Sequence, residues 1–274
     1  MSHRGLAILA LSLSLGACAT SGELAPTPEE QALSEELQAR SIVPASAAER
    51  EAIVHQDLLT QAAFWAEAFE LNPGDADAAL NLSNVLRQLN NAERAGEVAR
   101  QALALHPENI DLQAAYGLAM TSAGRGSLAV EPLTRATRSR PDNWTWINAL
   151  GVALEQSGRS GAARTQFEQA LLLSGGAPGP LNNLALSQML SGSPEQAETL
   201  LRRAMDQNTA NAQIRQNLAL ALALQGQFAE AQSIALIDAT PEMARANMDY
   251  VRSMMNSTRR YDSLRAFDDP NINR

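Results

Sequence analysis

The sequence predicts an all-α protein, a solenoid of stacked helical hairpins in place of one globular core. Between about residues 76 and 231, several columns of residues recur every 34 positions. One column holds alanine alone: Ala95, Ala129, Ala163, Ala197 and Ala231. Another holds residues that suit a tight turn: Asn90, Gly124, Gly158, Gly192 and Gly226. A period of this size indicates repeated two-helix units, each of which buries its apolar face only against its neighbours.

Residues 1–17 have the pattern of a secretory signal peptide. Arg4 supplies a positive charge, and the apolar run 5–15 is shorter than the roughly 20 residues that a membrane-spanning helix needs. The run leads to the tetrapeptide LGAC at 15–18, which resembles the lipobox of bacterial lipoproteins, and Cys18 is the only cysteine of the chain. The resemblance implies that Cys18 is acylated and becomes the new N-terminus. The alternative is an ordinary signal peptide with an incidental cysteine.

The predicted anchor on Cys18 attaches the mature protein to a membrane, because each buried CH₂ of an acyl chain contributes about 0.8 kcal/mol. Ala19 stands where enterobacterial lipoproteins carry the aspartate that retains them in the inner membrane. By this resemblance we expect the protein at the periplasmic face of the outer membrane. Residues 18–47 are then a lipid-anchored tether. A short helix is predicted over 27–40, with Thr27 as its N-cap and Pro28 at its first helical position.

The solenoid is predicted over 48–240. A long helical pattern at 49–71 misses the 34-residue register in its first half, and we interpret it as a degenerate leading repeat. About five regular units follow, each with a first helix, a turn and a second helix. They begin at Ala76, Ile110, Trp144, Pro178 and Ala212. In each unit the turn residue at position 15 is expected to adopt the left-handed conformation that ends the first helix.

Small residues are predicted to let the two helices of each unit pack closely. Position 8 is small in every regular unit: Ser83, Gly117, Gly151, Ala185 and Ala219. We interpret the large residue at position 7, such as Leu150, as the side chain that fills the space left by small residues at positions 8, 20 and 27.

Residues 241–274 form the predicted cap and tail. A helix from Pro241 to about Asn256 is expected to cover the last repeat, and the tail from Ser257 is expected to be frayed or partner-dependent. The apolar residues of this helix are Met243, Met248, Val251, Met254 and Met255. We expect core packing for them, with a soft binding surface as the alternative.

Composition and motifs exclude several classes of function. The net charge is −9, the pI is about 4.9, and all 21 basic residues are arginine. A nucleic-acid partner is not expected, because it would call for a basic face, and an acidic balance favours protein partners. The sequence has no G-x-S-x-G, H-E-x-x-H or P-loop motif. We therefore expect no enzyme, no catalytic residues, no cofactor, no metal and no small-molecule substrate.

The repeat unit resembles the tetratricopeptide repeat, a helical hairpin. Unit 144–173 shows this best. Its signature positions hold Leu150, Gly151, Leu154, Gly158, Ala163, Phe167 and Ala170. The resemblance implies that the first helices line a concave groove that binds a protein partner.

Primary amides recur on the first helices in repeat register. The predicted groove residues are Asn81, Asn84, Asn148, Asn182, Asn183, Leu186, Met189, Gln216, Asn217 and Leu220. An amide both donates and accepts hydrogen bonds, so a row of amides can hold an extended peptide backbone. The alternative is that these amides bond to neighbouring helices and order the stack. Arg87 is the only basic residue on this face in the regular repeats, so the groove does not resemble the carboxylate clamp of chaperone-binding repeats.

The whole mature chain resembles, more narrowly, the lipoprotein of the tight-adherence (Tad, or Flp) pilus system, the TadD type. The resemblance rests on the lipobox, the repeat array, the last repeat opening at 216–220, the closing helix 244–255 and the segment 261–264. It implies a non-catalytic periplasmic adaptor that binds the secretin, or another pilus component, and helps to assemble that pore. The alternatives are an adaptor for outer-membrane protein assembly or cell-wall synthase activation, and an enzyme accessory or carbohydrate-handling repeat protein.

Overall fold

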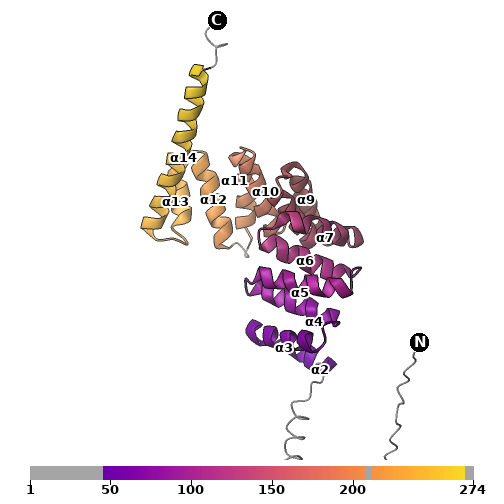
Figure 1. Ribbon diagram of the computed structural model, residues 1–274. Helices are drawn as coiled ribbons and strands as arrows, with labels where there is room; N and C mark the ends of the chain where they lie inside the picture. The colour runs from indigo at the N-terminus through magenta and orange to yellow at the C-terminus, as the bar shows by residue number, and fades with distance from the viewer. Residues whose placement is uncertain (1–45, 208–210, 269–274) are drawn as a thin grey trace, which may run out of the picture. The chain divides into compact units, whose positions relative to one another are not determined.

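The computed structural model describes residues 46–207 and 211–268, with side chains described up to residue 256. The described residues form helices and the turns between them (Figure 1). The helices are α2 (Ala47–Ile53), α3 (Leu58–Leu71), α4 (Ala76–Gln88), α5 (Ala92–Leu105), α6 (Ile110–Ser122), α7 (Gly126–Ser139), α8 (Trp144–Gln156), α9 (Ser160–Leu173), α10 (Pro178–Leu190), α11 (Pro194–Met205), α12 (Ala212–Leu224), α13 (Phe228–Ala235) and α14 (Pro241–Asp268). The predicted all-α solenoid is confirmed.

Five hairpins stack in chain order, from α4–α5 to α12–α13. Their first helices begin at the five residues predicted from the repeat register. The backbone of each first helix packs against that of the first helix of the next hairpin, whereas the backbones of consecutive second helices lie farther apart in the described part of the chain. The second helices α11 and α13 are still joined by an ion pair between Arg202 and Glu230. The first helices α4, α6, α8, α10 and α12 therefore lie on the inner side of the stack.

The turn column ends each first helix as predicted. Asn90 has a φ of 59°, and the four glycines of the column have φ values between 72° and 81°. In each turn, the backbone N–H of the next residue donates to the carbonyl five positions earlier, at 2.8–2.9 Å. This hydrogen bond satisfies a carbonyl that the end of the helix would otherwise leave open.

The two helices of a hairpin approach so closely that some positions allow no side chain. A Cβ atom on Gly151 would lie 2.5 Å from the Phe167 ring, and one on Gly117 would lie 2.5 Å from Leu133. Both large side chains are almost fully buried. The space over position 8 is thus filled from the second helix in these two hairpins, and our interpretation that position 7 fills it is wrong there.

The N-terminal part differs from the single helix predicted over 49–71. The predicted helix is interrupted between α2 and α3. Asp57 accepts hydrogen bonds from the N–H groups of Leu59 and Thr60 and so caps the start of a new helix. Arg50 on α2 pairs with Asp75 and Asp77 at the start of α4. Helix α2 is thereby tied to the first regular hairpin.

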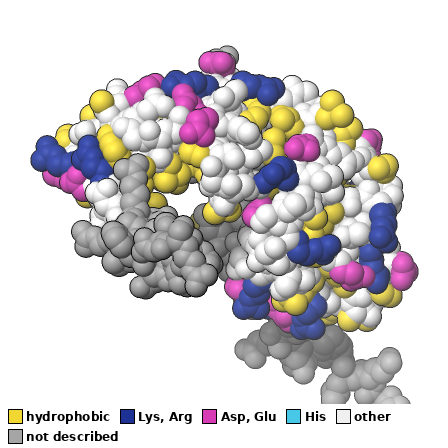
Figure 2. Space-filling view, turned by 90° about the horizontal axis from the view of Figure 1, so that it is seen from above, with side chains coloured by type: hydrophobic (Ala, Val, Ile, Leu, Met, Phe, Trp, Pro, Cys, Tyr) yellow, Lys and Arg dark blue, Asp and Glu magenta, His cyan; other side chains and the backbone are white. Residues whose placement is uncertain are grey.

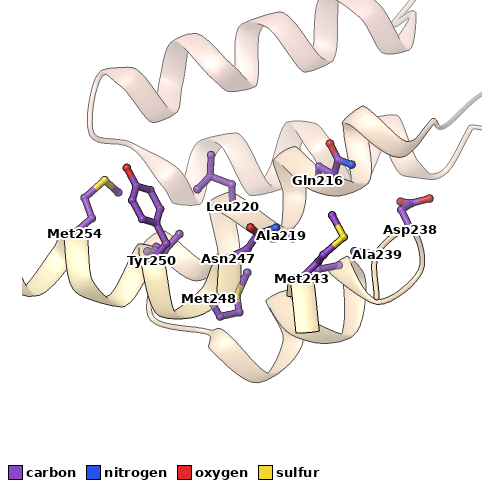
Figure 3. A pocket seen from close by; sticks show the side chains of 12 residues that line it. Gln216, Ala219, Leu220, Asp238, Ala239, Met243, Asn247, Met248, Tyr250 and Met254 are labelled. Carbon is purple, nitrogen blue, oxygen red and sulfur yellow. The ribbon is translucent and has the colours of Figure 1, made fainter. Parts of the chain in front are cut away.

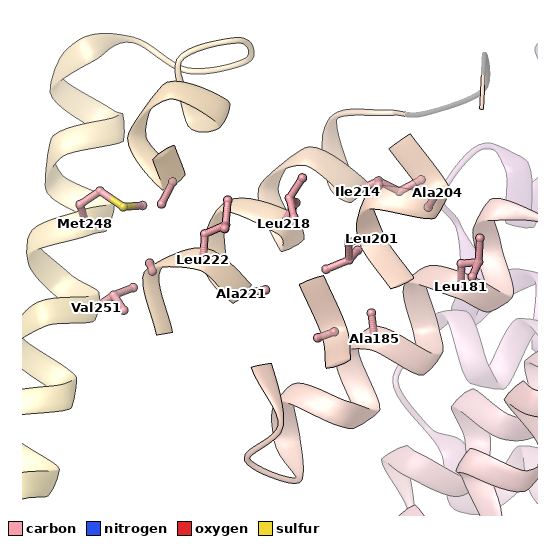
Figure 4. Packing of buried hydrophobic residues seen from close by; sticks show 13 residues of the cluster. Leu181, Ala185, Leu201, Ala204, Ile214, Leu218, Ala221, Leu222, Met248 and Val251 are labelled. Carbon is pink, nitrogen blue, oxygen red and sulfur yellow. The ribbon is translucent and has the colours of Figure 1, made fainter. Parts of the chain in front are cut away.

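The closing helix α14 packs on α12 and α13 and is longer than predicted. Ala244, Met248 and Val251 are buried. Met248 and Val251 continue a cluster that begins on α10 (Figure 4), whereas Ala244 packs in a separate cluster with Ala219 and Ala235. The helix ends at Asp268, not near Asn256. Between Pro241 and Pro270 the sequence contains no glycine or proline that would end the helix.

The signal peptide 1–17, Cys18 and the tether up to residue 45 lie outside the described residues, as do residues 269–274. Within the described part, no helix has the length and apolarity to cross a bilayer.

The close approach at Gly151 makes a specific prediction. We expect Gly151→Ala to lower the free energy of unfolding by about 1–3 kcal/mol, because the added methyl group overpacks the contact with Phe167. Gly161→Ala is the matched control, because a Cβ atom there meets nothing within 4 Å. Gly161→Ala should be neutral or up to about 1 kcal/mol stabilising, since alanine favours a helix over glycine. Urea unfolding of both variants measures this, and equal midpoints would contradict the close packing.

Candidate functional site

The predicted groove residues all lie on the first helices α4, α8, α10 and α12, and the surface they form is called the inner groove below. Asn182 is buried, with 5% of its surface exposed, and Gln216 is exposed. The remaining eight are partly buried: Asn81, Asn84, Asn148, Asn183, Leu186, Met189, Asn217 and Leu220. The structure thus brings these side chains to one side of the stack, although it does not gather them into one pocket.

Four of the amides form hydrogen bonds between consecutive hairpins. The Nδ2 of Asn183 donates to Oδ1 of Asn148 at 3.0 Å, and the Nδ2 of Asn217 donates to Oδ1 of Asn182 at 2.7 Å. Each bond joins position 5 of one first helix to position 6 of the next. These bonds are what the stack-ordering alternative predicts. Each pair also leaves one donor and one acceptor edge that make no hydrogen bond within the described chain.

Other predicted amides behave differently. The Nδ2 of Asn81 donates to the backbone carbonyl of Asp77 at 2.8 Å and to its carboxylate at 3.2 Å, so this side chain folds onto its own helix. Among the described residues, no hydrogen-bond partner is found for Asn84 or Gln216. Met189, which is not an amide, packs against the apolar cluster that runs from α10 to α14.

A polar pocket opens between α10 and α12, and it is called the α10–α12 pocket. Its volume is about 410 Å³. It is lined by Pro178, Gly179, Asn182, Asn183, Asn211, Gln213 and Ile214. Asn211 caps α12 by accepting from the N–H of Ile214 at 3.1 Å. The pocket presents amide groups to a ligand and no charged side chain.

An apolar pocket opens between α12 and α14, and it is called the α12–α14 pocket (Figure 3). Its volume is about 430 Å³, within the usual range for ligand sites. Two predicted groove residues, Gln216 and Leu220, lie on its α12 wall. Its other lining residues are Ala219, Ala235, Asp238, Ala239, Met243, Asn247, Met248, Tyr250, Val251 and Met254.

The α14 wall was missing from the predicted groove. Met243 and Met254 were expected in the core, yet they are 58% and 40% exposed, and Tyr250 is 71% exposed. Helix α14 lies outside the 34-residue register, so the register gave no sign that it extends the inner groove. One signal in the sequence could have indicated this wall: the methionines of α14, for which a soft binding surface was the alternative interpretation.

The α12–α14 pocket is close to electrically neutral. Among the described residues that line it, Asp238 and Tyr250 are the ionisable side chains. The Nε and Nη2 atoms of Arg215 donate to the two carboxylate oxygens of Asp238, both at 2.6 Å. These hydrogen bonds hold the pKa of the Asp238 carboxyl below its usual range, so the pair stays ionised near neutral pH.

Arg87 is the basic residue predicted on this face. Its Nε atom is buried and has no hydrogen-bond partner among the described residues, and burial lowers the pKa of its guanidinium. On the face seen in Figure 2, arginine and acidic side chains are interspersed and form no continuous basic field. In the described part of the chain, no group of three or more His, Cys, Asp or Glu side chains is placed to hold a metal ion.

These features define a helical-repeat protein whose inner groove carries neutral pockets suited to protein contacts. Sequence comparison matches residues 61–110, 113–180 and 182–244 to the tetratricopeptide repeat family, which is more than half of the chain. The chain therefore belongs to the tetratricopeptide repeat family, whose fold is a scaffold for protein–protein interaction. No curated protein sequence matches the chain significantly.

Several solved structures share the fold. PilW, described as a widely conserved type IV pilus biogenesis factor, is 19% identical with a TM-score of 0.58, covering 68% of this chain and 86% of its own. YrrB, described as a TPR protein with an unusual peptide-binding site, is 22% identical with a TM-score of 0.52, covering 71% of this chain and 98% of its own. MamA from Desulfovibrio magneticus RS-1 is 15% identical with a TM-score of 0.48, covering 64% of this chain and 91% of its own. At these identities the likeness to PilW and YrrB shows the fold alone.

The amide bonds between hairpins predict a measurable contribution to stability. We expect Asn182→Ala to be about 1 kcal/mol less stable than Asn84→Ala, because only Asn182 accepts a hydrogen bond from the next hairpin. Asn84→Ala is the matched control, since both changes gain the same helix propensity. Urea unfolding compares the two variants. If Asn182→Ala is as stable as the control, the amide pairs do not order the stack.

Proposed function

We propose that this protein is a non-catalytic periplasmic adaptor that helps to assemble the secretin of a Tad/Flp pilus. In this proposal Cys18 carries the lipid anchor, and the protein lies at the periplasmic face of the outer membrane. The partner is the secretin or another pilus assembly component. The inner groove makes the contact.

One observation carries the adaptor part of the proposal. Two pockets, one lined with amides and one lined with methionine and tyrosine, are formed with residues of the inner groove, and α12 contributes to both. Amides can bind a peptide backbone, and methionine adapts to apolar side chains of varied shape. A peptide surface of a partner protein matches both kinds of pocket.

The pilus part rests on resemblance. It is supported by the lipobox at 15–18, the closing segments at 244–255 and 261–264, and the description of PilW as a pilus biogenesis factor. The main alternative is an adaptor of the same design for outer-membrane protein assembly or cell-wall synthase activation.

Deletion of the chain tests this function. We expect loss of surface pili and of assembled secretin, with normal amounts of outer-membrane β-barrel proteins, measured by electron microscopy and immunoblotting. Re-expression of the wild-type chain should restore both. Normal pili after deletion would contradict the pilus assignment, and a general fall in β-barrel proteins would favour the alternative.

Cys18→Ala tests the lipid anchor independently of the partner, in the same strain. If the anchor is correct, the variant is released into the soluble periplasm, whereas the wild-type protein fractionates with outer membranes. Continued membrane association of the variant would show that Cys18 is not the anchor.

A further inference from the structure

Helix α14 has two apolar sides, and among the residues whose side chains are described only one of these sides is buried in the fold. The inward side holds Ala244, Met248 and Val251, which are 0%, 4% and 5% exposed. The other side holds Met243 and Tyr250, which are 58% and 71% exposed. A monomeric protein has no need of this second side, and large exposed apolar surfaces commonly mark interaction sites.

The spacing of the second side indicates the shape of what binds there. Met243, Asn247, Tyr250 and Met254 follow one another at intervals of four, three and four residues. This alternation places side chains along one seam of a helix, where they can insert between the side chains of a second helix. The seam covers three turns, or roughly 16 Å at 1.5 Å per residue.

The surroundings of the seam allow a helix backbone to come close. On the side of the seam that faces away from α12, the neighbouring residues of α14 are Ala246 and Ser253, which are small, uncharged and exposed. On the opposite side, Gln216 and Leu220 of α12 form the second wall (Figure 3). The α12–α14 pocket is thus a trough between two helices, with apolar side chains on both walls.

Charge limits the chemistry of the partner. Among the described lining residues, Asp238 is the side chain that carries a charge near neutral pH, and it is paired with Arg215 at one end of the trough. A charged side chain of the partner would lose its hydration there without gaining a counter-charge. The buried face of the partner must therefore be uncharged and apolar.

We propose that the α12–α14 pocket is the docking site for an amphipathic α-helix of a protein partner, about three turns long, with an uncharged apolar face. This inference rests on the protein-binding part of the proposed function. Tyr250 and the flanking methionines are the contacts on which the docking depends.

Site-specific photocrosslinking in living cells tests the docking site. The full-length lipoprotein carries p-benzoylphenylalanine in place of Tyr250, and a control carries it in place of Leu105, which is 59% exposed on α5. We expect the probe at position 250, and not at 105, to crosslink to one segment of a partner protein, which mass spectrometry identifies. A synthetic peptide of that segment should gain helical circular dichroism on binding the purified chain.

A paired variant measures the contribution of the seam. Met243→Glu with Met254→Glu should weaken binding of that peptide at least tenfold, because it places charges in an uncharged trough. Leu105→Glu should leave binding unchanged. Both variants alter exposed side chains, and circular dichroism checks that each still folds.

Several outcomes overturn the inference. They are the lack of a specific crosslink at position 250, a crosslink only to a second copy of this chain or to its own residues 18–45, and a bound peptide that gains no helix. If deletion of the chain abolishes pili but the Met243→Glu/Met254→Glu variant restores them fully, the proposed function stands and this docking site fails. If the helix docks as expected but deletion leaves pili intact, the site stands and the pilus function fails.

Discussion

The close approach of the two helices in each hairpin is the constraint on which the rest of the structure depends. The alanines at positions 20 and 27 are completely buried in every hairpin where they occur. Gly117 and Gly151 bring the second helix still closer, so that Leu133 and Phe167 pack directly on the first-helix backbone. Because the hairpins are thin, consecutive first helices can touch each other. That contact creates the inner groove and lets amides one repeat apart form hydrogen bonds.

The candidate site lies where the repeat ends. Within the regular hairpins, the alanines at positions 20 and 27 are fully buried where the two helices meet. Helix α14 takes the place of a further first helix but does not keep the repeat register, so its contact with α12 leaves a trough of about 430 Å³. The cap buries Met248 and Val251 against the last hairpin, while Met243 and Tyr250 remain outside. One helix thus both closes the hydrophobic core and supplies the binding wall.

The regular part of the fold could be predicted from the sequence because its signals repeat. The five first helices begin at the predicted residues, since four follow an Asp or Asn cap and α10 has a proline at its first position. The break before α3 was missed, although Ser46 with Glu49 and then Asp57 are helix-capping residues. The amides of the groove were found, and bonding between neighbouring helices was one of the two interpretations given for them, but the particular pairing was not assigned. It joins positions 35 residues apart, and only the offset between neighbouring hairpins reveals it.

The central claim is that α14 is held against α12 and α13 and so forms one wall of the binding site. Amide hydrogen exchange of the full chain, followed by mass spectrometry, tests it most directly. The account predicts slow exchange for residues 244–255, comparable with α12, because these amides open only when the packed cap detaches. Exchange of this segment at the rate of an unstructured peptide would contradict the account, because the trough would then have no second wall.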